Sequence, residues 1–137
     1  MPNTLLSPEP LAFNKGLASI RILVGLMMAY HGFEIFQPHI METYQTWDII
    51  KALPAPVAMV YLGKGLEFFT GVCFVFGIFT RIAALFMAID LLFICFFVGG
   101  GRFYYEDQHP FLFALLALVY FFAGPVTWSL DQRIFNK

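Results

Sequence analysis

The chain has 137 residues, of which 60% are hydrophobic, 19% aromatic and only 12% charged, and its mean hydropathy is +0.76. This composition is too apolar for a soluble domain of this size and predicts an integral membrane protein. A net charge of −1 without any basic run excludes nucleic acid as a partner. Cys73 and Cys95 lie in separate apolar runs, far apart in the expected bundle, so neither a disulfide nor a zinc site is predicted.

Four apolar stretches predict an all-α, four-helix transmembrane bundle in which residues 1–137 form a single domain. The first stretch carries no cleavage pattern, so we expect it to be retained as a span. Each stretch approaches the roughly 20 residues that a hydrocarbon core requires. The expected spans are residues 16–36, 57–79, 82–98 and 106–124.

The ends of the fourth span are the least defined by the sequence. Because the apolar run that starts at Pro110 is short, we expect this helix to begin nearer Tyr105 or to continue past Gly124-Pro125. Proline suits a first helical turn, where its missing N–H would be unpaired anyway. Asp107 or Gln108 is expected to cap the same turn.

The segment between the first two spans, residues 39–53, places apolar side chains three to four positions apart. This spacing predicts an amphipathic helix that lies at the membrane interface. An ordinary polar loop is the alternative, since one weak period can arise by chance. The expected apolar face consists of Ile40, Tyr44, Trp47 and Ile50.

The distribution of cationic residues predicts the orientation of the bundle. Four spans place both termini on one side, and more cationic residues flank that side than the other. By the positive-inside rule, both termini are expected in the cytoplasm. The residues on the terminal side are Lys15, Arg81, Arg133 and Lys137, and those on the opposite side are Lys51 and Arg102.

Five ionisable side chains are expected in the outer half of the bundle or at its centre. A charge near the middle of a membrane helix costs at least about 2.5 kcal/mol on insertion scales, so these groups are expected to face a polar interior. This pattern predicts a small pocket that binds a ligand or moves protons, with the lysine holding an anionic or carbonyl oxygen. The alternative is a buried ion pair that only sets the helix register. The five residues are His31, Glu34, Lys64, Glu67 and Asp90.

Three more residues are placed relative to this pocket. Glu106 and His109 are expected at its outer rim, next to the start of the fourth span. Arg21 lies toward the cytoplasm as support for that side, where its long side chain is expected to snorkel to the surface.

Two patterns around Glu67 bear on packing and on metal binding. Gly63, Glu67 and Gly71 recur every four residues, which would let a neighbouring helix come close. The carboxylate–iron pattern needs Glu-x-x-His on two helices, whereas this chain has only the reversed His31-Phe-Gly-Glu34. No metal site is therefore predicted.

Four groups of residues carry a resemblance to a known family. They are Arg21, Gly25 and His31-Gly32; Gly65-Leu66-Glu67 with Gly71; the run from Gly77 to Ala84; and the run from Gly124 to Asp131. Together they cover about residues 16–131, and in these features the chain resembles the DoxX family of small four-helix membrane proteins. Val126 stands where the family usually has the second glycine of Gly-Pro-Gly. The resemblance implies a multi-pass protein of the bacterial inner (plasma) membrane.

Some members of that family are linked to quinone-dependent oxidation of thiosulfate, and others to membrane-associated redox and detoxification complexes. The resemblance therefore implies a small subunit of a redox- or quinone-linked membrane assembly. Besides the lipid bilayer, a redox protein or a second copy of the chain would be its partner, and a quinone its ligand. Whether the chain is itself an enzyme is left open, and no catalytic residue is assigned. The alternative is a non-catalytic binder of a lipid or small amphiphile, or a membrane assembly factor.

Overall fold

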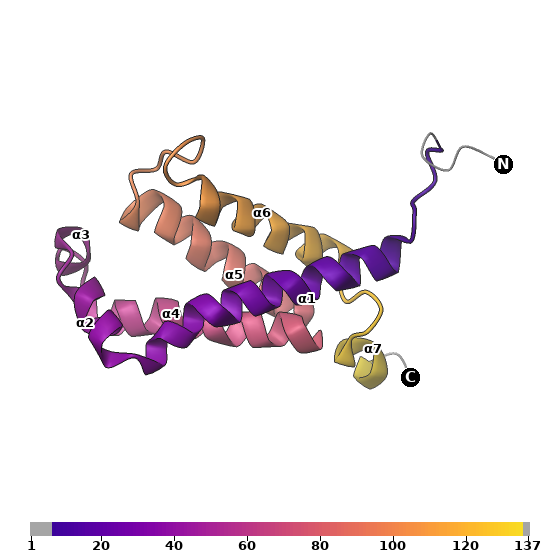
Figure 1. The fold of residues 1–137 in the computed structure, drawn as a ribbon, viewed down its shortest axis with the longest axis horizontal. Coiled ribbons are helices and arrows are strands. Elements are labelled where there is room, and N and C mark those ends of the chain that lie inside the picture. Colours follow the sequence, from indigo (N-terminus) through magenta and orange to yellow (C-terminus); the bar gives the residue numbers. More distant parts are fainter. Residues whose placement is uncertain (1–6, 136–137) are drawn as a thin grey trace.

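The computed structural model describes residues 7–135, and every regular element within them is helical. Four long helices run in alternating directions, with α1 packed on α4, α4 on α5 and α5 on α6 (Figure 1). This arrangement confirms the all-α fold class. The long helices are α1 (Phe13–Gly32), α4 (Pro56–Phe76), α5 (Thr80–Phe93) and α6 (Gln108–Ala123).

Within residues 7–135, three helical segments are long and apolar enough to cross a membrane: Phe13–Phe36, Pro56–Phe76 and Thr80–Val98. The first includes a 3₁₀ turn, η2 (Phe33–Phe36), and the third ends in a π-helical turn, η3 (Ile94–Val98). Helix α6 has 16 residues and is therefore about 24 Å long, less than the roughly 30 Å of a hydrocarbon core. A fourth crossing stays a prediction.

The ends of α6 differ from the expectation, because the helix neither starts near Tyr105 nor continues past Ala123. At its start, the Asp107 carboxylate makes no capping hydrogen bond and instead accepts one from the backbone N–H of Arg102 at 2.9 Å. The preceding loop therefore competes with the helix for this side chain. At the other end, Gly124 adopts a φ of 74°, which ends the helix.

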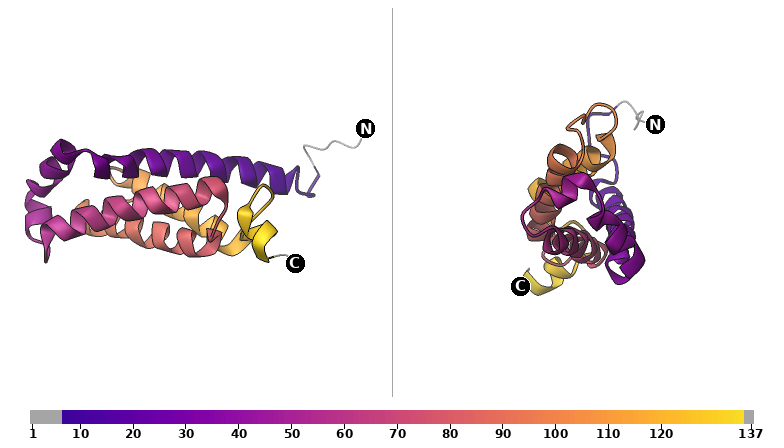
Figure 2. Two further views of the ribbon diagram at one scale, coloured as in Figure 1. Left: turned by 90° about the horizontal axis from the view of Figure 1, so that it is seen from below. Right: turned by 90° about the vertical axis from the view of Figure 1, so that its left-hand side faces the viewer.

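The connection between α1 and α4 is helical, so the polar-loop alternative is wrong, but the single expected helix is divided. It consists of α2 (Pro38–Gln45) and α3 (Asp48–Lys51), separated by a turn in which the N–H of Trp47 bonds to the carbonyl of Tyr44. Met41 and Ile50 are buried against Val60 of α4 in a small second core. Helices α2 and α3 thus cover one end of the bundle (Figure 2).

Glycines let α1 and α4 approach very closely. A Cβ atom on Gly32 would lie 2.0 Å from the backbone nitrogen of Phe68, and one on Gly71 would lie 2.3 Å from that of Ala29. Only the small residue fits at either position. Gly63 does not belong to this contact, because its Cα faces α5 and Asp90.

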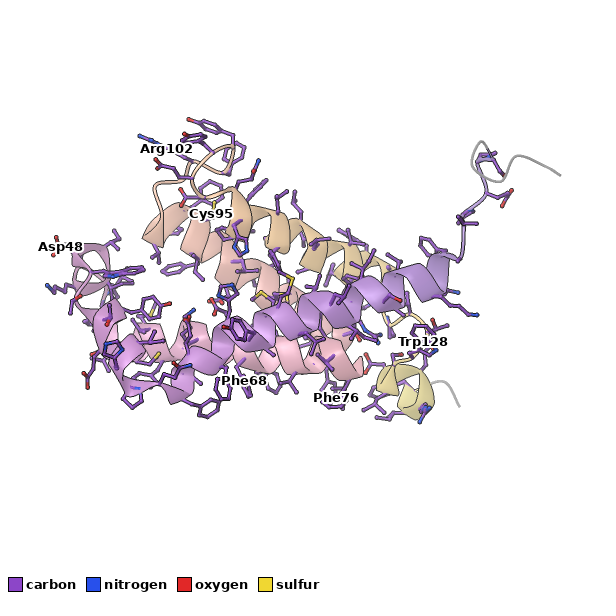
Figure 3. The ribbon with its side chains drawn as sticks, in the orientation of Figure 1. Asp48, Phe68, Phe76, Cys95, Arg102 and Trp128 are labelled. Atoms are coloured by element: carbon purple, nitrogen blue, oxygen red, sulfur yellow. The ribbon has the colours of Figure 1, made fainter. Side chains whose placement is uncertain are left out.

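The opposite end of the bundle is closed by the C-terminal segment, which includes α7 (Leu130–Phe135). The Asp131 carboxylate accepts hydrogen bonds from the backbone N–H groups of Phe79 (2.7 Å) and Thr80 (2.8 Å), so it caps α5 from a distant part of the chain. Figure 3 shows Trp128 at this end, whereas Asp48 and Arg102 lie at the other.

Arg21 does not snorkel to the surface, and that expectation is wrong. The side chain is fully buried: its Nε donates to the carbonyl of Phe74 at 3.0 Å, and its Nη2 donates to that of Trp128 at 2.6 Å. Gly77 leaves room for the guanidinium, since a Cβ there would lie 2.6 Å from Nη1. Backbone carbonyls at the end of the bundle thus replace water as the partners of Nε and Nη2.

The two cysteines take no part in cross-linking. Cys73 and Cys95 are both free and buried, as the span order led us to expect. Cys73 belongs to the main apolar core, whereas the thiol of Cys95 points to the carbonyl of Asp107 at 3.6 Å.

Candidate functional site

Lys64 lies at the centre of a polar cluster near the end of the bundle that α2 and α3 cover. Its Nζ is 2.9 Å from Oε2 of Glu34 and 2.9 Å from Oε2 of Glu67. The exposed fractions of the Lys64 and Glu67 side chains are 14% and 6%, so this ion pair is largely removed from solvent. Lys64 therefore points into the protein.

Two local features bring these charges together. Lys64 and Glu67 are three positions apart on α4, a spacing that places side chains on the same face of a helix. Glu34 lies in η2, immediately after the close contact of α1 with α4 at Gly32. The glycine contact thus sets the distance between the carboxylate of one segment and the lysine of the other.

Tyr44 of α2 completes the cluster, although the sequence suggested only an interfacial role for it. Its hydroxyl donates a hydrogen bond to Oε2 of Glu34 at 2.6 Å, and its ring centre lies 5.1 Å from Nζ of Lys64. Burial and the hydrogen bond to Glu34 raise the pKa of Tyr44, so the hydroxyl stays protonated and acts as a donor. The helical period of residues 39–53 was the one sequence signal for this position, since it put Tyr44 on the apolar face of the expected helix.

Asp90 of α5 lies apart from these ion pairs. The residue is only 7% exposed, and its Oδ2 atom is buried without a hydrogen-bond partner among residues 7–135. A Cβ atom built on Gly63 would lie 3.5 Å from Oδ1, so the carboxyl group faces the bare backbone of α4. Buried polar atoms are normally paired, so an unpaired one calls for an explanation.

A cavity of about 400 Å³ joins Asp90 to the lysine cluster. Helices α2 and α3, the first half of α4, the second half of α5 and the π-helical turn η3 form its walls. Most of the lining is apolar, as in typical sites for small organic ligands. Its polar side chains are Tyr44, Lys64, Glu67 and Asp90, and apolar residues that line it include Trp47, Leu62, Leu66, Ile89, Phe93 and Ile94.

Three of the residues expected at the site lie elsewhere. His31 and His109 are exposed neighbours, with ring centres 5.8 Å apart, and neither lines the cavity. Glu106 is exposed and pairs with Arg102 at 3.5 Å. The structure therefore brings Lys64 together with its carboxylates but gives the histidines a separate position, between α1 and α6.

Metal ligands do not cluster in the part of the chain that is described. No group of three or more His, Cys, Asp or Glu side chains there is arranged to hold a metal ion. Of the two carboxylates that line the cavity, Glu67 pairs with Lys64, and Asp90 has no hydrogen-bond partner at Oδ2 among residues 7–135.

Comparison with known proteins adds a family to this geometry. Neither the curated proteins nor the solved structures contain a significant match to the chain. The DoxX family profile matches residues 16–100, which include most of α1, the α2–α3 segment, α4, α5 and every polar residue of the cavity. The match covers more than half of the sequence and agrees with the membrane-spanning helices, so the chain belongs to the DoxX family.

Proposed function

We propose that this membrane protein is a small subunit of a redox- or quinone-linked assembly, and that its cavity binds the head group of a quinone. One observation carries the proposal: a cavity of about 400 Å³ with apolar walls has ionisable groups at two places in its lining. A quinone ring needs a flat apolar slot, and its oxygens need groups that exchange protons as it is reduced or oxidised.

The ionisable residues of the cavity are suited to exchanging protons with a bound quinone. Reduction of a quinone takes up two electrons and two protons. Carboxyl groups next to the ring, above all Asp90, supply or accept protons in this proposal, while electrons come from a redox partner protein. Glu34 and Glu67 hold Lys64 in place, and the π-helical turn at Ile94 shapes the wall, as such turns often do at functional sites.

The proposal places the protein in the bacterial inner membrane with both termini in the cytoplasm. The start of α1 and α7 lie at the same end of the bundle (Figure 2). Arg81 in the first turn of α5 and Arg133 of α7 lie at this end too, because Asp131 of α7 caps α5. The cavity lies toward the opposite end, beneath α2 and α3. It would therefore be nearer the outer face, where a periplasmic or membrane-bound partner could reach it.

Fluorescence quenching provides a direct test, because the two tryptophans lie at opposite ends. Trp47 lines the cavity and Trp128 does not. In a Trp128→Phe background reconstituted in nanodiscs, a short-chain benzoquinone should quench Trp47 saturably. Gly63→Leu, which fills the space beside Asp90, should abolish the saturable component, whereas Gly16→Leu, at a position in open space, should preserve it.

Non-saturable quenching that is identical in all three proteins would refute quinone binding. A lipid or amphiphile that copurifies with the parent protein and is lost only in Gly63→Leu would instead support the alternative, a non-catalytic binder or assembly factor. The apolar walls of the cavity are the observation that keeps this second function in view.

A further inference from the structure

Two of the three donors of Lys64 are already occupied. A lysine ammonium group carries three N–H donors and no acceptor. Two of them are accounted for by Glu34 and Glu67, each at 2.9 Å, and the ring of Tyr44 lies against the same ammonium at 5.1 Å. One donor then remains, on an ammonium group that two carboxylates and an aromatic ring already hold in place, so the role of Lys64 as a ligand for a carbonyl or anionic oxygen stays a prediction.

The unmatched group in the cavity is the carboxyl group of Asp90, which offers an acceptor oxygen whether or not it is protonated. Oδ2 of Asp90 is buried and has no hydrogen-bond partner in the described part of the chain, and α5 contributes no cation to the lining of the cavity. The carboxylates of Glu34, Glu67 and Asp90 also outnumber the one lysine beside them. A ligand that offers a hydrogen-bond donor would satisfy Asp90, whereas an anion would meet an excess of negative charge.

The mouth of the cavity is apolar. Trp47, Leu62 and Ile89 line it and are also 45%, 58% and 55% exposed, respectively. Leu62 and Ile89 lie within the candidate spans of α4 and α5, so their exposed faces meet lipid rather than water. A ligand can therefore enter between α4 and α5 from the bilayer, with its apolar tail still in the hydrocarbon.

From these observations we infer that the cavity selects a membrane-soluble amphiphile whose hydroxyl head donates a hydrogen bond to Asp90. This inference rests on the proposed quinone site and deepens it: the preferred form is the hydroquinone, which carries O–H donors, rather than the oxidised quinone, which carries only acceptors. Asp90 is then the residue that determines specificity. A site built to bond a hydroxyl discriminates strongly against an analogue that lacks it.

A redox-inert pair of probes isolates the hydrogen bond. An alkylphenol and its methyl ether share the ring and tail, but only the phenol donates. Titrated into detergent-extracted protein and followed by native mass spectrometry, the phenol should bind about tenfold more tightly, equivalent to about 1.4 kcal/mol. Asp90→Leu, an apolar replacement of similar size, should remove the difference, and Glu106→Leu, which changes an exposed carboxylate outside the cavity, should retain it.

A second pair of variants tests the route of access. Ile89→Phe narrows the proposed mouth, whereas Leu85→Phe changes an exposed apolar residue one turn away on α5 that does not line the cavity. In lipid nanodiscs, Ile89→Phe should slow phenol binding several-fold and Leu85→Phe should leave its rate unchanged. Equal rates in both variants would overturn lateral access.

Other outcomes separate this inference from the proposed function. Equal affinity for phenol and ether in the parent protein, or a difference that persists in Asp90→Leu, would overturn the role of Asp90. If the quinone still quenches Trp47 saturably in that case, the proposed quinone site stands without the preference for a donor. If neither the quinone nor the phenol binds, both proposals fail.

Discussion

The substitution Lys64→Met tests whether the ion pairs at the centre of the site are shielded from water. The change shortens the unbranched side chain by only one atom but removes its charge, so Glu67 would remain in a setting where its side chain is 6% exposed and has lost its cation. Removing one partner of a buried pair typically costs about 3 to 5 kcal/mol. Because Glu34 is 24% exposed and keeps its bond to Tyr44, we expect the lower end, about 3 kcal/mol.

The assay is unfolding in mild detergent, followed by circular dichroism. A loss of about 3 kcal/mol lowers the ratio of folded to unfolded protein by more than a hundredfold. The double variant Lys64→Met/Glu67→Gln should recover much of the loss, since Glu67 is then neutral and the only carboxylate left without its cation is Glu34, which is 24% exposed and bonded to Tyr44. Lys51→Met, which breaks an exposed pair with Asp48, should have no measurable effect. If Lys64→Met unfolds like Lys51→Met, the lysine reaches water and the site described around it is wrong.

Three further predictions concern the packing of the helices, the cap of α5 and the orientation in the membrane. Gly32→Ala should destabilise the protein strongly, because its methyl group would meet the backbone of α4, whereas Gly16→Ala, in open space, should be neutral or slightly stabilising in the same unfolding assay. Asp131→Ala should cost about 1 to 2 kcal/mol by removing the hydrogen bonds to two amides at the start of α5, and unchanged stability would argue against this cap. In intact cells, a membrane-impermeant thiol reagent should label Tyr104→Cys, which the proposed topology puts on the outer side, but not Arg133→Cys, which it puts in the cytoplasm. The two native cysteines are buried and should give no background. The reverse pattern would invert the proposed topology.

The membrane class and most of the helices could be predicted from the sequence because both depend on local composition. Apolar stretches of sufficient length predict spans whatever their neighbours are. Gly99 to Gly101 mark the end of the third helix in the same way. The contact of Lys64 with Glu67 also follows from local geometry, since three residues of a helix bring two side chains together.

The side of each helix that faces the site, in contrast, was decided by packing between helices. His31 and Glu34 are one turn apart in the sequence, yet Glu34 turns toward Lys64, whereas His31 faces His109, because the 3₁₀ turn η2 breaks the helical period between them. For the same reason, depth in the membrane alone could not separate the residues that line the cavity from those that lie outside it.

Hydrogen-bond partners that are distant in the sequence could not be predicted from local patterns either. Arg21 is buried because carbonyls of Phe74 and Trp128 meet it at the end of the bundle, and Tyr44 joins the polar cluster because α2 folds back over α4. A side chain becomes buried and bonded only where other segments surround it. Hydropathy therefore determined which segments enter the membrane, while close packing at Gly32 and Gly71 determined which charges meet within it.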